Sequence, residues 1–177
     1  MEDDKYKIYT HFNTERNELF FAKKILLVEG DSDKILFSTL AEEKWDLNLD
    51  NKGVSVVECG GKSGVIYFIG VCRLLGITEF FAVWDQDDDK EDAFDQLKFA
   101  LEEGSGLEIP ENLETFLNLS ANNKNKVQKA YEWATTTDQI PAEFDIIKRF
   151  LTSDETSISQ IESETETNIT IDNELIS

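Results

Sequence analysis

Three short apolar runs, each followed by polar residues and a helical pattern, most constrain how this 177-residue chain can fold. The runs cover residues 25–28, 54–57 and 80–84. Amphipathic stretches predict helices over residues 31–43, 65–75 and 91–103. Strands that alternate with helices of this length favour βαβ units. Because the strands are apolar throughout, we expect an α/β fold in which a mostly parallel sheet is flanked by helices.

Further helices are expected outside these units, at residues 14–22, 126–135 and 142–151. We divide the chain into a lead-in with a short helix (1–23), a core (24–110), a C-terminal helical extension (111–151) and an acidic tail (152–177). The tail is rich in Ser, Thr, Glu and Asn and has no basic residue, so we expect it to be disordered. The alternative to disorder is a weak last strand at residues 168–171.

The chain carries a formal net charge of −20, from 37 Asp and Glu against 17 Lys and Arg. Taken alone, this charge argues against a nucleic-acid ligand, because Lys and Arg normally supply that affinity. Two cysteines and one histidine exclude a disulfide framework and a Cys/His zinc cluster. No apolar run is long enough to span a membrane, and the N-terminus does not resemble a signal peptide. We therefore expect a cytoplasmic protein without a membrane partner.

Acidic residues follow two of the three predicted strands. Glu29 comes after the first, with Asp33 four residues further on, while Asp85 and Asp87 come after the third. The carboxyl ends of parallel strands meet at one edge of a sheet, so these side chains would converge there. Carboxylates without His or Cys suit Mg²⁺ or Mn²⁺, which would also offset their repulsion. Considered alone, residues 85–89 would be an ordinary solvated loop, but their position after an apolar strand favours a metal site.

A glycine-rich loop with Gly60, Gly61 and Lys62 follows the second strand. A P-loop would need a further glycine five residues before Gly61, where Val56 stands inside the strand. We therefore expect no ATP site in this chain. The glycines instead permit a tight turn that exposes backbone amides.

Glu29 after one apolar strand, with Asp85 and Asp87 after a later one, resembles the Toprim domain of topoisomerases, primases and related nucleases. The surrounding residues 14–34, together with the glycine-rich loop, resemble the OLD (overcoming lysogenisation defect) family of nucleases. That family includes the nuclease subunit of Gabija-type phage defence and places an ATPase before its Toprim domain. The sequence contains no ATPase domain, so the resemblance implies an ATPase supplied by another chain, or an excised or reduced nuclease domain.

The resemblance runs from about residue 14 to residue 151 and implies roles for individual side chains. Lys126 matches the family's lysine segment, although Asn125 and Val127 replace its usual Gly and Pro. Asp33 stands where the family usually has Glu. The implied catalytic residues are Glu29, Asp85 and Lys126. Lys124 or Lys129 could take the place of Lys126 in this role. The implied metal ligands are Glu29, Asp33, Asp85, Asp87 and Glu114. Phosphate binding is assigned to Gly60, Gly61, Lys62, Lys124 and Lys129.

The function that the resemblance implies is hydrolysis of DNA phosphodiester bonds with two Mg²⁺ or Mn²⁺ ions. DNA and an ATPase subunit are the implied partners, and a homo-oligomer is compatible with the sequence. Two alternatives remain open, a small Toprim nuclease that processes RNA and a Toprim-like module that binds a partner without cutting. Because the chain is acidic and has one tight basic cluster, at residues 124–129, we expect weak DNA binding by this domain alone.

Overall fold

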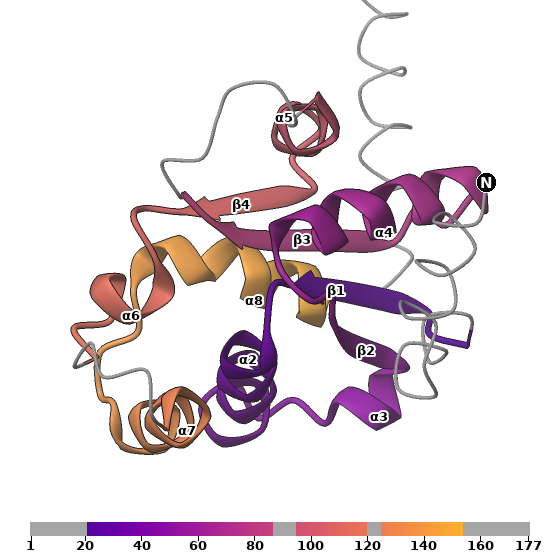
Figure 1. Ribbon diagram of the computed structural model, residues 1–177. Coiled ribbons are helices and arrows are strands. Elements are labelled where there is room, and N and C mark those ends of the chain that lie inside the picture. Colours follow the sequence, from indigo (N-terminus) through magenta and orange to yellow (C-terminus); the bar gives the residue numbers. More distant parts are fainter. Residues whose placement is uncertain (1–20, 87–94, 120–124, 154–177) are drawn as a thin grey trace, which may run out of the picture.

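The computed structural model describes residues 21–86, 95–119 and 125–153. Within these ranges, four strands form one parallel sheet in the order β2-β1-β3-β4 (Figure 1). The strands are β1 (Lys24–Val28), β2 (Val54–Glu58), β3 (Phe80–Asp85) and β4 (Gly106–Ile109). The predicted α/β fold with a parallel sheet is therefore confirmed.

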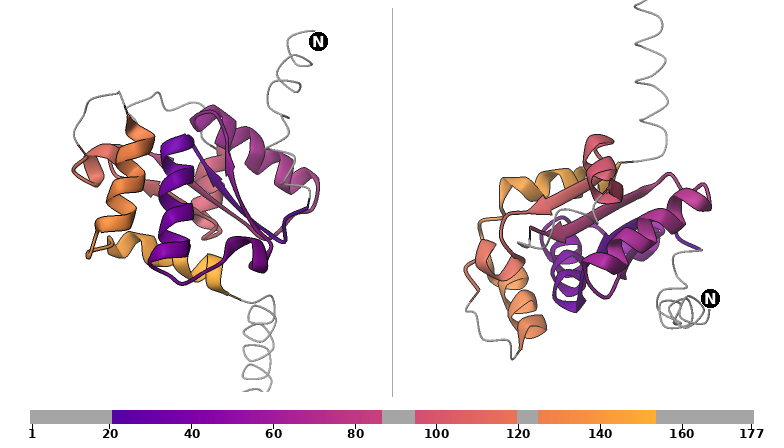
Figure 2. Two further views of the ribbon diagram at one scale, coloured as in Figure 1. Left: turned by 90° about the horizontal axis from the view of Figure 1, so that it is seen from below. Right: turned by 45° about the horizontal axis from the view of Figure 1, so that its top comes forward.

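Helices cover both faces of the sheet (Figures 1 and 2). One face packs against α4 (Lys62–Leu74) and α5 (Asp95–Glu102). The other packs against α2 (Asp31–Glu43), α7 (Lys126–Thr136) and α8 (Asp145–Thr152). The short elements are α3 (Leu49–Lys52), α6 (Leu113–Phe116) and the 3-10 turn η2 (Ala142–Phe144). Among the described residues, no helix is long and apolar enough to cross a membrane.

Strands β1, β2 and β3 each supply side chains to two separate cores, because successive residues of a strand point to opposite faces. In β1, Leu26 and Val28 belong to the core under α2, whereas Ile25 and Leu27 belong to the core under α4. All four side chains are fully buried. The uninterrupted apolar run in the sequence thus reflects a strand covered on both faces.

Lys24, the first residue of β1, is buried although it is charged. Its Nζ donates to the carbonyl oxygen of Phe150 at 2.9 Å and to the carbonyl oxygen of Ser153. It also lies 2.6 Å from the hydroxyl oxygen of Ser153 and 5.3 Å from the ring centroid of Phe150. Lys24 therefore satisfies carbonyl groups at the C-terminal end of α8 and ties that helix to the sheet.

The sequence did not predict β4, because Gly106 was taken as the stop of the preceding helix. A Cβ atom on Gly106 would lie 2.7 Å from the ring of Trp84, so the strand needs glycine for close packing. Two further predictions change in detail. Helix α4 begins at Lys62 rather than at Val65, and the predicted helix 142–151 divides into η2 and α8.

Several predicted segments lie wholly or mostly outside the described residues. These are most of the lead-in helix predicted at 14–22, the first residues of the helix predicted at 91–103, and the acidic tail beyond Ser153. Of the predicted lead-in helix, only Phe21 and Ala22 are described, and they are not helical.

Candidate functional site

The carboxyl ends of β1, β2 and β3 open into a cavity of about 360 Å³. The strand order brings β1 between β2 and β3, so loops that are distant in sequence meet at this edge. The lining residues are Glu29, Gly30, Asp31, Ser32, Asp33, Glu58, Gly60, Gly61, Asp85, Leu113, Glu114 and Lys126. Five of the residues predicted for catalysis or metal binding are thereby brought together, namely Glu29, Asp33, Asp85, Glu114 and Lys126.

Two acidic residues enter the cavity from the connection between β1 and α2. Glu29 directly follows β1, and its Oε1 atom is inaccessible to solvent. Asp33 lies in the first turn of α2, where its Oδ2 accepts a hydrogen bond from the backbone N–H of Gly30 at 3.0 Å. This contact fixes the Asp33 carboxyl at the N-terminal end of the helix, where a negative charge is favourable.

The pKa of Asp33 is raised from 3.8 to about 7. The main cause is burial, and the negative charges of Asp85 and then Glu29 raise it further. The N–H of Gly30 acts in the opposite direction. Three carboxyl groups are therefore close enough that the ionisation of one is opposed by the others.

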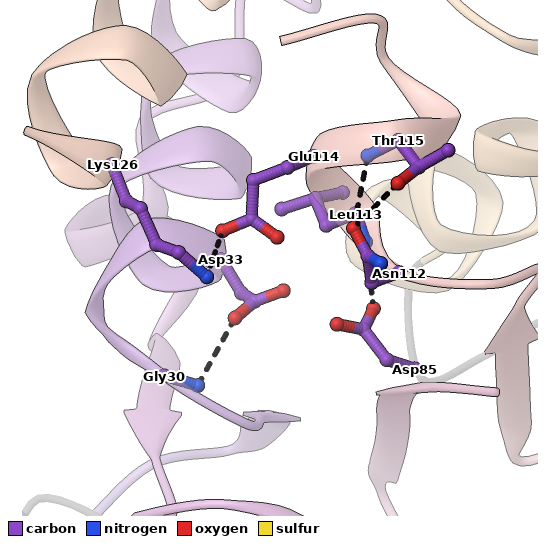
Figure 3. Close-up of polar contacts among 8 residues, drawn as sticks. All are labelled: Gly30, Asp33, Asp85, Asn112, Leu113, Glu114, Thr115 and Lys126. Atoms are coloured by element: carbon purple, nitrogen blue, oxygen red, sulfur yellow. Dashed lines mark hydrogen bonds and ion pairs between the residues drawn. The ribbon is translucent and has the colours of Figure 1, made fainter. Parts of the chain in front are cut away.

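Asp85 is held at the end of β3 by α6. The backbone N–H of Leu113, the first residue of α6, donates to Oδ1 of Asp85 at 3.0 Å (Figure 3). Asn112 caps this short helix, because its Oδ1 accepts from the N–H of Thr115 at 2.9 Å. The capped turn places Glu114 next to the cavity, with its side chain 16% exposed.

Lys126 reaches the cavity from the first residue of α7. Its Nζ lies 2.7 Å from Oε1 of Glu114 (Figure 3). The pKa of Lys126 is raised, chiefly by this hydrogen bond and also by the charges of Glu114, Asp85 and Asp33, while burial opposes the shift. Lys126 is therefore a cation held among carboxylates.

The glycine-rich loop, which follows β2, forms part of the wall of the cavity. Gly60 and Gly61 have φ angles of 80° and 101°, in the region that only glycine adopts readily. The N–H of Gly61 donates to the carbonyl oxygen of Glu29 at 2.8 Å, which ties the loop to the end of β1. A Cβ atom on Gly64 would lie 1.8 Å from the carbonyl oxygen of Cys59, so glycine is required there too.

Four of the predicted residues are not placed in this cavity. Asp87 and Lys124 lie outside the described residues. Lys62 and Lys129 lie on α4 and α7 but do not line the cavity.

The sequence interpretation overlooked Glu58, which does line the cavity. It is the last residue of β2, paired in register with Val28, and thus follows an apolar strand run as Asp85 does. The sequence signal that could have identified Glu58 was its position directly after the apolar run 54–57.

Within the described ranges, no group of three or more Asp, Glu, His or Cys side chains is arranged to hold a metal ion. The chemistry of the residues present nevertheless fits a hard divalent cation. Carboxylate oxygens are the donors that Mg²⁺ and Mn²⁺ prefer. Glu29, Asp33 and Asp85 also share a buried excess of negative charge that a cation would neutralise.

The parallel sheet, with Glu29 directly after β1 and Asp85 at the end of β3, gives this molecule an α/β fold of the Toprim type. The family model described as "Overcoming lysogenization defect protein-like, TOPRIM domain" matches residues 20–87. Residues 20–87 are therefore similar to an OLD-like TOPRIM domain, in agreement with the resemblance found in the sequence.

Two known proteins illustrate this relationship. An OLD nuclease of Thermus scotoductus is 39% identical over 84 residues, which cover 48% of this chain and 16% of that nuclease. The chain therefore matches only a small part of that relative. The C-terminal region of the OLD protein of Xanthomonas campestris pv. campestris has the same fold, with a TM-score of 0.54 and 18% sequence identity. That similarity covers 75% of this chain and 95% of the solved one.

Proposed function

We propose that this domain is a metal-dependent endonuclease that hydrolyses DNA phosphodiester bonds. The observation that carries the proposal is the single cavity in which Glu29, Asp33 and Asp85 meet the Lys126–Glu114 pair. Carboxylates alone would suit a structural cation. A lysine held beside them adds a group that can contact the phosphate of a substrate.

The carboxylates would bind the cations. Glu29, Asp85 and Asp87 are the proposed ligands of one ion, and Asp33 with Glu114 would contribute to a second. When bound, divalent cations supply polarisation of a phosphoryl oxygen and activation of water for an in-line displacement. The N–H of Leu113 holds one oxygen of the Asp85 carboxylate and so orients this group at the cavity.

Lys126 would neutralise the charge that develops on the phosphate. Its raised pKa keeps the ammonium group protonated at neutral pH. Glu114 holds it at the cavity, and a cation bound by Glu114 would weaken this ion pair. Lys124 and Lys129, a few residues away on either side, are the alternatives for this role or further contacts to the DNA backbone.

The glycine-rich loop is the proposed seat for a neighbouring phosphate. The N–H of Gly61 donates to the carbonyl oxygen of Glu29, so we assign the phosphate contact to Gly60 and to the N-terminal end of α4. Because the chain is strongly acidic, we propose that an ATPase subunit or domain helps to hold the DNA, as in a phage-defence ATPase–nuclease system.

A nicking assay tests the proposal. The protein is incubated with supercoiled plasmid in Mg²⁺ or Mn²⁺, alongside Glu29→Gln, Asp85→Asn and the distant exposed control Asp138→Asn. We expect nicking by the wild type and the control, loss in both site variants, and none in EDTA. Absence of nicking in either metal, or full nicking by both site variants, would contradict the proposal.

A second measurement separates the alternative functions. Titration of Mn²⁺ by calorimetry reports whether the site binds a cation independently of cleavage. Binding without cleavage of plasmid or of a labelled RNA hairpin would favour a partner-binding module. Cleavage of the hairpin alone would favour an RNA-processing nuclease.

A further inference from the structure

A second groove, larger than the site cavity, lies along the outer edge of the sheet. It has a volume of about 460 Å³. Its walls include Lys34, Ser38 and Glu42 of α2, Asp50 of α3, and the strand residues Val54 and Val56 of β2. It shares no residue with the cavity at the carboxyl ends of the strands. The proposed nuclease function therefore leaves this groove unexplained.

Strand β2 is the edge of the sheet, since among the described residues it pairs with β1 alone. The bonds of Gly53 and Cys59 show which of its backbone groups face β1. The carbonyl of Gly53 accepts from Lys23 at 2.8 Å, and the N–H of Cys59 donates to Val28 at 2.9 Å. Neighbouring residues of a strand alternate in direction, and the register is unbroken from Val54 to Glu58. The N–H and C=O groups of Val54 and Val56 therefore point away from β1.

A site that binds an added edge strand needs outward-pointing backbone groups and a wall for side chains, and this groove has both. The polar backbone groups of Val54 and Val56 can pair with an added strand, and the outward side of α2 forms the wall beside it. Phe21 contributes an apolar side chain to the same groove and is 87% exposed. An extended segment could thus gain main-chain hydrogen bonds from β2 and an apolar contact from Phe21.

The charge of the groove selects what such a segment would be. Glu42 and Asp50 are exposed carboxylates on its walls, against one lysine, Lys34. The whole chain is acidic as well, with a net charge of −20. An acidic peptide or a nucleic acid would be repelled, whereas Lys or Arg side chains would find partners on both walls.

We propose that this groove binds an extended, basic segment of another polypeptide, which adds as a strand to the outer edge of β2. Side chains of the segment would alternate, one set contacting the groove and the other set facing solvent. The backbone supplies affinity, and Glu42 and Asp50 supply the preference for positive charge.

The test uses a fluorescein-labelled peptide, acetyl-Lys-Val-Lys-Ile-Lys-Val-amide, measured by fluorescence anisotropy with the full chain. Two N-methylated versions remove the N–H groups of alternate residues. Only one of these sets faces β2 in an added strand. We expect one methylated peptide to lose at least about tenfold in affinity and the other to bind within about twofold of the parent. The acidic counterpart, with Glu in place of Lys, should not bind.

Protein variants locate the peptide. Glu42→Lys with Asp50→Lys should weaken binding about tenfold, because both substituted side chains are exposed and lie on the groove. Glu43→Lys is the matched control and should bind normally, because Glu43 is the next residue of α2 and is also exposed but lies outside the groove. In an amide NMR spectrum, Val54 and Val56 should shift on addition of peptide.

Three results would overturn the proposal. The first is equal loss from both methylation patterns, which would mean that no strand is added. The second is a loss with Glu43→Lys as large as with the groove variant, which would indicate attraction by overall charge alone. The third is loss in Glu29→Gln with Asp85→Asn, which would place the peptide in the acidic site cavity. Because these site variants are tested separately, failure of the proposed nuclease function would not affect the result.

Discussion

The ammonium group of Lys126 lies 2.7 Å from Oε1 of Glu114, so a predicted catalytic residue and a predicted metal ligand are paired with each other. The pair joins the first turn of α7 to α6 and closes one side of the cavity. A cation that attracts Glu114 would weaken this ion pair and make Lys126 available to the phosphate of a substrate. Lys126 can therefore be tested separately from metal binding.

Replacement of Lys126 should separate catalysis from cation affinity. We expect Lys126→Met to lower the nicking rate by about 100-fold or more. The substitution removes the positive charge that would neutralise the negative charge developing on the phosphate. Mn²⁺ affinity, measured by calorimetry, should not fall, because Met leaves Glu114 free of its ion pair. Lys148→Met, an exposed lysine on α8, is the matched control. A variant with wild-type nicking would exclude Lys126 from the reaction.

Asp85→Asn should lower metal affinity without unfolding the domain. The amide oxygen of Asn can still accept the N–H of Leu113, so α6 stays attached to the end of β3. Removing a charged ligand should reduce Mn²⁺ affinity at least about tenfold. Calorimetry measures the affinity and circular dichroism checks the fold, with Asp138→Asn as control. Unchanged affinity would remove Asp85 from the ligand set.

The stability of the metal-free protein should fall with rising pH because of Asp33. Folding raises the pKa of this carboxyl from 3.8 to about 7, so the folded state holds the proton more tightly than the unfolded chain. Stability is then lost as the pH rises from about 4 to about 7. In EDTA at pH 8, Asp33→Asn should exceed the wild type by up to about 4 kcal/mol in free energy of unfolding.

Urea unfolding at pH 5.5 and pH 8 checks this expectation for Asp33. The advantage of Asp33→Asn should be smaller at the lower pH, where the wild-type carboxyl is mostly protonated in the folded state. An equal difference at both pH values would show that Asp33 does not titrate as described.

Two glycines of α4 should respond in opposite directions to substitution by alanine. Gly64→Ala places a Cβ atom 1.8 Å from the carbonyl oxygen of Cys59, and we expect a loss above about 4 kcal/mol or failure to fold. At Gly70, on the same helix, a Cβ atom meets nothing within 4 Å. Gly70→Ala should therefore stabilise the protein by roughly 0.5–1 kcal/mol. Urea unfolding compares both, and similar effects at the two positions would contradict the described turn.

Lys24 should contribute to stability although it is far from the site. Lys24→Met leaves the carbonyl groups of Phe150 and Ser153 without their donor, which should cost about 1–3 kcal/mol. The neighbouring residue Lys23 is exposed, so Lys23→Met should change stability by less than about 0.5 kcal/mol. Thermal unfolding of the two variants measures the difference, and equal melting temperatures would rule out the proposed attachment of α8.

The pattern of apolar runs was sufficient to predict β1, β2 and β3, because a strand buried on both faces must be apolar at every position. It was not sufficient for β4. That strand has four residues and begins at Gly106, whose role depends on the ring of Trp84 more than twenty residues away. A local pattern contains no information about such a contact, so the glycine was interpreted as a helix stop.

The candidate site also combines features that local sequence predicts with features that depend on distant parts of the chain. Glu29, Asp33 and Asp85 were found because each stands at the end of an apolar strand run or in the helix turn that follows it, and parallel strands end at one edge. Glu58 was overlooked although it ends β2. The hydrogen bond from Leu113 to Asp85 and the burial that raises the pKa of Asp33 could not be derived from spacing, since both arise from elements distant in the chain.

The sequence by itself determined the parallel α/β fold, the edge of the sheet at which acidic residues gather, and the resemblance to the OLD family. These follow from periodicity and from residues adjacent to strands, which are local properties. Only the tertiary structure decided that Lys126 pairs with Glu114, that Lys24 holds α8, and that the edge of β2 forms a groove. These depend on which elements pack together, and that is set by the burial of both faces of the sheet at once.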